Sequence, residues 1–124
     1  MPHIVALAVG QDPLLLEMRS QVLQSAGYMV VCALSVEEAL QHFVSSDFDI
    51  VILCHSIPVL DRERLTCAIH SRSAATPVVV VASRFSAIDR FADAMIENEP
   101  DILLQEIPRI LHDAEKYHRE ARRA

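Results

Sequence analysis

Few residues of this sequence could do covalent chemistry, and the most suggestive of them are the neighbours Cys54 and His55. A thiol beside an imidazole base is the kind of pair that nucleophilic or redox catalysis uses. Cys54, however, closes the apolar run 49–54, which has the pattern of a buried strand, and adjacent side chains of a strand point to opposite faces. A reactive thiol also needs a nearby cation or helix N-terminus. We therefore expect Cys54 to be a packing residue, and a thiol-dependent enzyme is the alternative.

The other cysteines and the histidines give no further site. Cys32, Cys54 and Cys67 are odd in number and scattered, which fits neither a disulfide framework nor a zinc spacing and favours a reducing compartment. His112 and His118 lie six residues apart on one predicted helix and do not share a face. We expect no metal and no cofactor.

The composition limits the partners and the location. The chain has 124 residues, 52% of them hydrophobic, and a formal charge of −6. An acidic chain does not offer the cationic face that nucleic acid requires, and the C-terminal arginines are interleaved with glutamates. No apolar run approaches the roughly 20 residues that a bilayer needs, and no secretory signal opens the chain. We expect a cytoplasmic protein with no nucleic-acid or membrane partner.

Strands and capped helices alternate along the first half of the chain. Strands are predicted over 3–9, 29–33 and 49–54, where apolar and β-branched side chains gather. The first helix begins at Asp12-Pro13, an N-cap followed by proline, and ends at Gly27. The next helix opens with the capping box that runs from Ser35 to Glu38.

The second half continues this alternation. We expect a helix from about Asp61 to Ser71, and a strand over 77–82 that contains four consecutive valines. The helical spacing of apolar residues after Ser86, as far as Ile96, predicts another helix. The short run 101–104 predicts the fifth strand, and a last helix is expected over about 107–123.

Five strands, each followed by a helix, predict one domain over residues 1–124 with a parallel sheet covered on both faces. Right-handed crossovers make such a sheet doubly wound. Ligands then bind beyond the carboxyl ends of the strands. Any site should therefore lie at the loops after Val9, Cys54, Ala82 and Leu104.

Five segments resemble response-regulator receiver domains in their order and spacing. They are Asp12–Met18, Ser25–Tyr28, Glu37–Leu40, Phe48–Val51 and Thr76–Val80. The resemblance covers about residues 3–112. It implies a flavodoxin-like (βα)5 receiver fold with strand order 2-1-3-4-5, and a role in the phosphorelay signalling of two-component systems.

Carried over position by position, the resemblance implies a degenerate active site. The acidic pair that holds Mg²⁺ in the family corresponds to Gly10 and Gln11, and the phospho-accepting aspartate corresponds to Cys54. The hydroxyl residue that closes the fourth strand in the family corresponds to Ala82, with Ser83 beside it. The family's lysine corresponds to Gln105, and the proline after that lysine corresponds to Glu106. The aromatic switch position corresponds to Ile102. Asp12 is retained, and we expect it to cap a helix.

These replacements remove the groups that phosphoryl transfer uses. Mg²⁺ prefers carboxylate oxygens, and the transfer needs the metal and a cation to offset developing charge. We therefore expect no aspartyl-phosphate chemistry and no enzymatic activity. The alternatives are a divergent response regulator that stays in a phosphorelay by a non-standard mechanism, and a flavodoxin-like or thiol-dependent enzyme.

The resemblance also suggests a partner-binding face around the fourth helix, the fifth strand and the fifth helix. Arg84, Phe85 and Ile102 are its candidate residues, because an exposed aromatic beside an arginine is a common interface anchor. Alternatively, Phe85 folds over the vacated site. We expect a stand-alone pseudo-receiver that signals through a protein partner, and a homodimer stays open.

Overall fold

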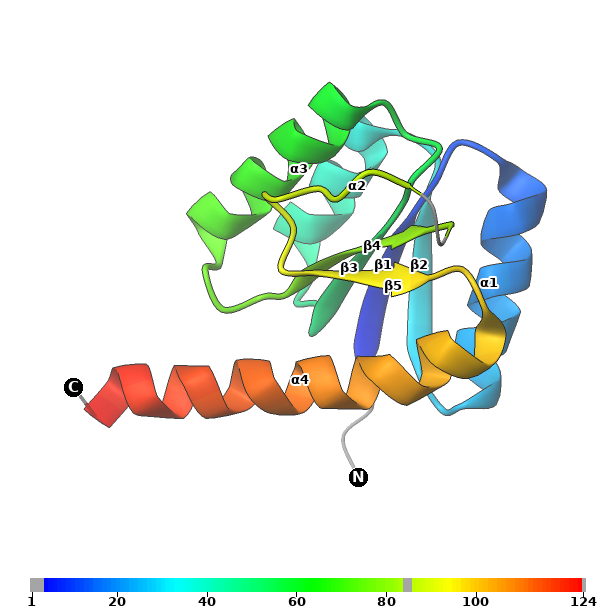
Figure 1. Ribbon diagram of the computed structural model, residues 1–124. Helices are drawn as coiled ribbons and strands as arrows, with labels where there is room; N and C mark the ends of the chain where they lie inside the picture. The colour runs from blue at the N-terminus through cyan, green and yellow to red at the C-terminus, as the bar shows by residue number, and fades with distance from the viewer. Residues whose placement is uncertain (1–3, 84–85, 124) are drawn as a thin grey trace.

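The computed structural model describes residues 4–83 and 86–123, the last seven as backbone only. Five strands form one parallel sheet in the order β2-β1-β3-β4-β5, which confirms the predicted fold class and strand order. The strands are β1 (Val5–Val9), β2 (Met29–Ala33), β3 (Ile50–Cys54), β4 (Val78–Ala82) and β5 (Ala94–Glu97). The helices in the described part of the chain are α1 (Pro13–Ser25), α2 (Val36–Ser45), α3 (Val59–Arg72) and α4 (Pro100–Arg123), as Figure 1 shows.

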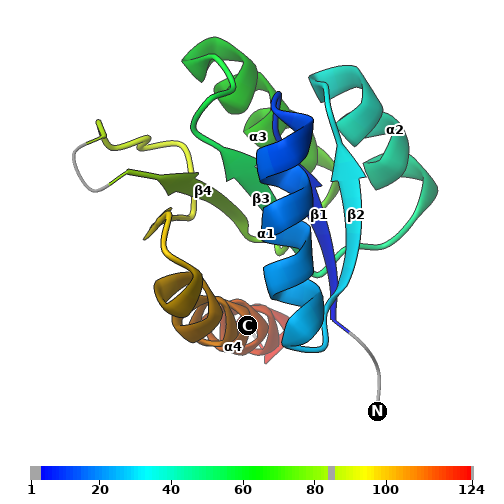
Figure 2. The ribbon, with the colours of Figure 1, turned by 90° about the vertical axis from the view of Figure 1, so that its right-hand side faces the viewer.

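Helices cover both faces of the sheet (Figure 2), and each face has its own apolar core. Helices α2 and α3 pack on one face, where Leu53 is buried with Leu65 of α3. Helices α1 and α4 pack on the other, where Ile52 is buried with Leu23 and Ile107. Because successive strand side chains alternate between the two faces, Cys54 follows Ile52 onto the α1/α4 face.

Local signals set the ends of the first two helices as predicted. The Asp12 carboxylate accepts the backbone N–H groups of Leu14 and Leu15, which α1 itself leaves without partners. Gly27 has a φ of +93°, a left-handed conformation that side-chain-bearing residues rarely adopt. The Ser35 hydroxyl accepts from the backbone N–H of Glu38 at the start of α2.

The helix predicted after Ser86 is wrong, and its last residues belong to β5 instead. Ala94 to Glu97 pair in parallel with Val79 to Ala82. Met95 packs into the α2/α3 core, whereas Ile96 is buried in the α1/α4 core, an alternation that suits a strand and not a helix. The segment 86–93 crosses as bends, turns and irregular chain, with Asp89 buried in an ion pair with Arg62 of α3.

The predicted fifth strand over 101–104 and the start of the last helix near 107 are also wrong. Both stretches belong to α4, which begins at Pro100 and contains Pro108 within it. Leu103 and Ile107 are buried together against the sheet. They are four residues apart, a spacing that places both side chains on one face of a helix, so the segment is helical. None of the helices in the described residues is both long and apolar enough to cross a bilayer.

Candidate functional site

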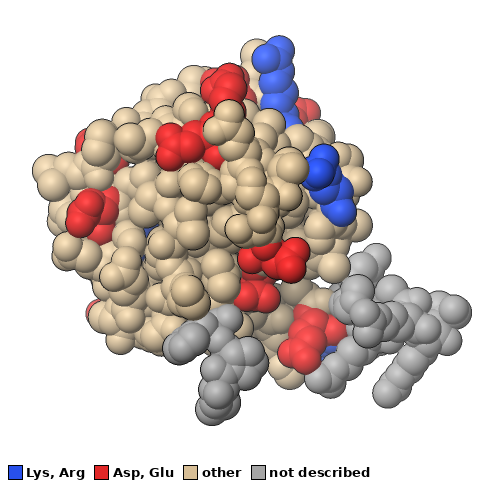
Figure 3. All heavy atoms as spheres, turned by 180° about the vertical axis from the view of Figure 1, so that it is seen from behind, with Lys and Arg blue, Asp and Glu red and all other residues tan. Residues whose placement is uncertain are grey.

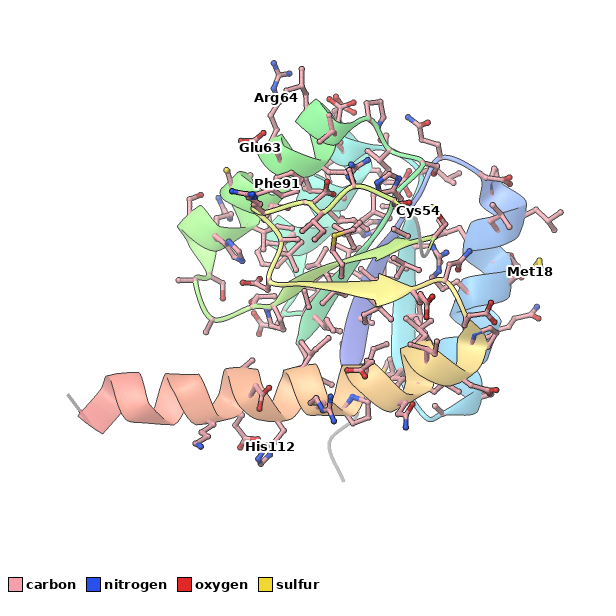
Figure 4. All side chains as sticks on the ribbon, in the orientation of Figure 1. Met18, Cys54, Glu63, Arg64, Phe91 and His112 are labelled. Carbon is pink, nitrogen blue, oxygen red and sulfur yellow. The ribbon has the colours of Figure 1, made fainter. Side chains whose placement is uncertain are left out.

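The carboxyl ends of β1, β3 and β5 bring three residues to the side of the sheet that α1 covers. Gly10 follows β1, Cys54 ends β3 and Asn98 follows β5. Gly10 is buried against Cys54, because a Cβ placed on it would lie 3.3 Å from the Cys54 Cβ. In Figure 4, Cys54 lies at this end of the sheet. These residues lie at the edge of the sheet where the sequence analysis expected any site, and Asn98 was not among the predicted residues.

A tight turn after β3 places a hydroxyl group on the Cys54 thiol. The Ile57 N–H donates to the Cys54 carbonyl over 3.1 Å, which turns the chain back on itself. Ser56 then donates from its Oγ to the Cys54 Sγ, at 3.1 Å. Cys54 as a residue is partly exposed.

Arg19 of α1 supplies the cation of this cluster, and the sequence analysis missed it. The residue is only 8% exposed, and its Nη2 donates to the Asn98 Oδ1 over 2.9 Å. One sequence signal could have found it: Arg19 lies three residues after Leu16 and four before Leu23, both buried, so it shares the inward stripe of α1.

Opposing effects act on the ionisation of Cys54. Burial raises the pKa of the thiol, but hydrogen bonds from Ser56 and the proximity and charge of Arg19 outweigh it, so the net pKa lies below its ordinary value. An adjacent cation favours the thiolate because it offsets the negative charge. The expectation that Cys54 is a packing residue stays a prediction, which a measurement of its reactivity would test. His55 does not act as a base on this thiol through its Nε2, since that buried atom has no hydrogen-bond partner among the described residues.

The positions that the resemblance assigned to metal binding do not offer a metal site. Gly10 has no side chain, Gln11 is exposed, and the Asp12 carboxylate caps α1. Gln11 and Gly10 line a pocket of about 390 Å³ between the first turns of α2 and α3. No group of three histidine, cysteine, aspartate or glutamate side chains in the described residues could hold a metal ion. A thiol, an amide and a capping carboxylate do not fit Mg²⁺.

The assignments at the ends of the fourth and fifth strands need one correction. Ala82 ends β4 and is buried, and the Ser83 hydroxyl forms a 2.8 Å hydrogen bond with that of Ser86. Gln105, assigned to the lysine position, lies on α4, because the chain leaves the sheet at Glu97. The residue that follows β5 is Asn98, which meets Arg19.

The remaining assigned positions fall on α4 or outside the described chain. Glu106 and Ile102 are α4 residues, and Ile102 packs against the α1/α4 core instead of lying in a strand as the aromatic switch position would. Strand β5 contains no aromatic side chain. Arg84 and Phe85 lie outside the described residues, so the partner-face prediction at these two positions stays a prediction.

The parallel sheet in the order 2-1-3-4-5, with its cluster at the carboxyl ends of the strands, defines a receiver-type α/β fold. Solved structures agree. A putative response regulator from Chloroflexus aurantiacus J-10-fl superposes with a TM-score of 0.81 at 26% identity, covering 90% of this chain and 99% of that chain. A CheY-like receiver domain protein from Methanospirillum hungatei JF-1 gives 0.82 at 24%, covering 94% and 99%.

A third neighbour was solved with a bound ligand. The response regulator TrrA from Thermotoga maritima, in complex with Mg²⁺-BeF, superposes with a TM-score of 0.75 at 24% identity, covering 86% of this chain and 98% of that chain. No family model matches the sequence, and no curated protein matches it either. The structural neighbours are therefore CheY-like receiver domains, and the fold of this chain is theirs.

Proposed function

We propose that this protein is a pseudo-receiver, which acts in signal transduction by binding a protein partner and not by accepting a phosphoryl group at the usual position. The observation that carries the proposal is the content of the cluster at the carboxyl ends of β1 and β3. Gly10 and Cys54 lie close together where the resemblance places a metal-binding carboxylate and the phospho-accepting aspartate, with too little room for a side chain on Gly10 unless a neighbour shifts. A thiol and a glycine provide neither metal ligands nor a carboxylate nucleophile.

The electrostatics of the cluster support this reading. Phosphoryl transfer relies on a metal ion held by carboxylates and on a cation near the transferred group. Here the cation, Arg19, is buried and donates to Asn98. Its charge is one of the effects that lower the pKa of the Cys54 thiol. The Asp12 carboxylate is engaged by the first N–H groups of α1. The polar groups of the cluster are thus engaged by other groups of the same chain. We propose that the protein is not an enzyme and uses no cofactor.

An exposed apolar surface supports a protein partner. Leu14, Leu15 and Met18 of α1 are 69%, 46% and 55% exposed, and Met18 projects outward from the helix in Figure 4. Leu15 and Met18 also line a hollow of about 220 Å³ that continues onto the start of α4 at Pro100 and Leu103. Contiguous apolar surface of this kind is typical of protein interfaces.

The charges of the surface favour a protein over nucleic acid. Exposed acidic side chains border the apolar surface at Glu17 and Glu99. On the face turned away from the viewer of Figure 1, acidic side chains are scattered and the described residues form no broad basic patch (Figure 3). Because nucleic acid binding needs clustered cations, we propose a protein partner in the cytoplasm, with a second copy of this chain as the alternative occupant.

Thermal unfolding tests the proposal directly. A ligand that binds only the folded state raises the free energy of unfolding, by about 2.7 kcal/mol at a hundred times its Kd, and so raises the unfolding temperature. We expect no change on adding millimolar Mg²⁺ with beryllofluoride, because the cluster lacks carboxylate ligands. TrrA, measured in parallel, is the positive control, since that protein binds Mg²⁺-BeF. A rise of several degrees that needs both additives would overturn the proposal.

The partner surface has its own test. Replacing Met18 and Leu15 by glutamate should leave the unfolding temperature nearly unchanged, because both side chains are largely exposed. The same change should weaken binding to a purified partner, or abolish dimerisation if sedimentation shows the wild-type chain to be a dimer. Glu17→Gln, on the same helix, is the control for a mere change of charge. Unaltered association in the Leu15/Met18 variant would exclude this surface.

A further inference from the structure

Helix α4 is longer than the sheet on which it packs. Its 24 residues span about 36 Å, whereas a five-residue strand such as β1 spans about 17 Å. Leu103 and Ile107 are buried against the sheet, and Ile110 packs beside them. Further along, the helix extends beyond the sheet towards the C-terminus, as Figure 1 shows, and Lys116 is exposed there. We call residues 116–123 the tail of α4.

The apolar stripe of α4 does not stop where the sheet stops. In the sequence, steps of three and four residues separate Ile107, Ile110, Ala114, Tyr117 and Ala121. This spacing places successive positions on one face of a helix. The protein's own core covers the first two positions, whereas Ala114 is partly exposed. The tail therefore continues the apolar stripe past the point at which the sheet covers it.

The charge of α4 changes sign along the helix. The exposed acids Glu99 and Asp101 lie at its start, and neither forms an ion pair among the described residues. The sequence of the tail contains four basic residues and one acidic residue, which are Lys116, Arg119, Arg122, Arg123 and Glu120. This order also suits the dipole of the helix itself, so the charges alone do not call for a partner. The apolar stripe of the tail does, because burying it stabilises the helix.

A hollow of about 220 Å³ lies at the other end of α4, between its start and α1. Leu15 and Met18 line the hollow, and both side chains are largely exposed. Glu99 also lines it, whereas the one arginine of the hollow, Arg19, is only 8% exposed and donates to Asn98. The hollow therefore offers apolar surface beside acidic charge, which complements an apolar stripe beside basic charge.

We propose that the partner at the apolar surface of α1 is a second copy of this chain, and that the tail of each copy occupies the hollow of the other. Tail and hollow lie near opposite ends of α4 (Figure 1), so two antiparallel α4 helices bring each tail to the other copy's hollow at once. Such an arrangement closes as a two-fold dimer and leaves no open end for further copies. The inference rests on the proposed function, because it names the partner at the same surface.

Sedimentation of the full chain is the first test. We expect a dimer whose dissociation constant rises with added salt, because salt screens exposed charges. Leu15→Lys with Met18→Lys removes apolar surface and places two cations against the basic tail, so this variant should be a monomer. A wild-type chain that is monomeric at every concentration would overturn the inference, and so would a dimer that survives these two substitutions. Assemblies that grow beyond a dimer would contradict the closed arrangement.

A charge swap tests which surfaces meet. The tail variant carries Arg119→Glu and Arg122→Glu, and the start variant carries Glu99→Lys and Asp101→Lys. In each variant alone, like charges face each other at both contacts, so the dissociation constant of the dimer should rise by more than about tenfold. In an equal mixture of the two variants, opposite charges meet at both contacts. A mixed dimer should therefore form, and native mass spectrometry distinguishes it by its mass.

Arg64→Glu with Arg72→Glu is the matched control and should dimerise as the wild type does. Both arginines are exposed on α3, and Arg64 lies on the opposite side of the molecule from α4 in Figure 4. If the start variant does not fold, Glu99→Gln with Asp101→Asn replaces it and should still bind the tail variant more tightly than the tail variant binds itself. A mixture without a mixed dimer would overturn the inference. The response to Mg²⁺ with beryllofluoride tests the pseudo-receiver proposal separately.

Discussion

Arg62 and Asp89 form a two-point ion pair inside the protein. The Arg62 Nε lies 2.7 Å from Asp89 Oδ2, and Nη2 lies 3.0 Å from Oδ1, with side chains only 5% and 4% exposed. The remaining Arg62 nitrogen donates to the backbone carbonyls of His55 and Ile57. One side chain of α3 thus joins the turn that follows β3, next to Cys54, to the helix-free crossing between β4 and β5.

Breaking that pair should be among the most damaging single changes away from the sheet. Asp89→Asn leaves the Arg62 charge buried without a counter-ion, and we expect a loss of about 3–5 kcal/mol in the free energy of unfolding. Urea unfolding measures it, with Glu63→Gln, an exposed acid on the same α3 helix, as the control.

A double variant separates lost charge from lost packing. Arg62→Met combined with Asp89→Leu replaces both charges by apolar groups, so it should recover much of the stability that Asp89→Asn loses. If Asp89→Asn unfolds at the same urea concentration as the wild type, the ion pair does not hold the crossing in place.

The ionisation of Cys54 should make stability depend on pH. Its pKa is lowered in the folded protein, so between that value and the ordinary thiol value of about 8.5 the unfolded chain binds more protons. The free energy of unfolding contributed by Cys54 should therefore rise with pH through this window, and be lost as the pH falls through the folded pKa. Unfolding under reducing conditions, compared with Cys54→Ser, should show a difference that grows with pH; a constant difference would argue against a held thiolate.

Asp12 should behave as a helix cap and not as a metal ligand. Asp12→Ala removes the acceptor for the Leu14 and Leu15 N–H groups and should cost about 1 kcal/mol. Asp12→Ser keeps an acceptor and should cost less, although it removes the carboxylate. Both variants and the wild type should respond alike to Mg²⁺ in thermal unfolding. A response to Mg²⁺ that Asp12→Ser abolishes would show that the carboxylate binds metal.

Gly27 should resist substitution for conformational reasons alone. Gly27 follows the end of α1 with a φ of +93°, and a Cβ added to it would meet no atom within 4 Å. Gly27→Ala should therefore destabilise the protein by strain, on the order of 1 kcal/mol, without a packing clash. Asn tolerates the left-handed region better, so Gly27→Asn should cost less than Gly27→Ala in the same denaturation assay. Equal stability of all three proteins would contradict this account.

The local sequence determined most of the sheet and the first three helices. Some features influence only the residues next to them in the chain, so they can be interpreted without knowing the rest of the fold. They are the proline after Asp12, Gly27, the Ser35 capping box and the four valines of β4. The strand order came with the receiver resemblance, which depends on several such signals in a fixed order.

Tertiary contacts decided the region after β4 and the chemistry of the cluster. Met95 and Ile96 have helical spacing with Phe91 and Ala92, yet they pair with the edge of β4 as a strand. Arg62 binds Asp89 in the helix-free crossing that leads to this strand. Because the sequence analysis predicted the fifth strand over 101–104, it assigned Gln105 to the position after that strand, which Asn98 occupies in the structure. Ser56 meets Cys54 only because a turn folds back at the end of β3, and Arg19 meets Asn98 only because α1 packs on the same face of the sheet. Charges that meet across the fold leave no local pattern, because their partner lies far away along the chain.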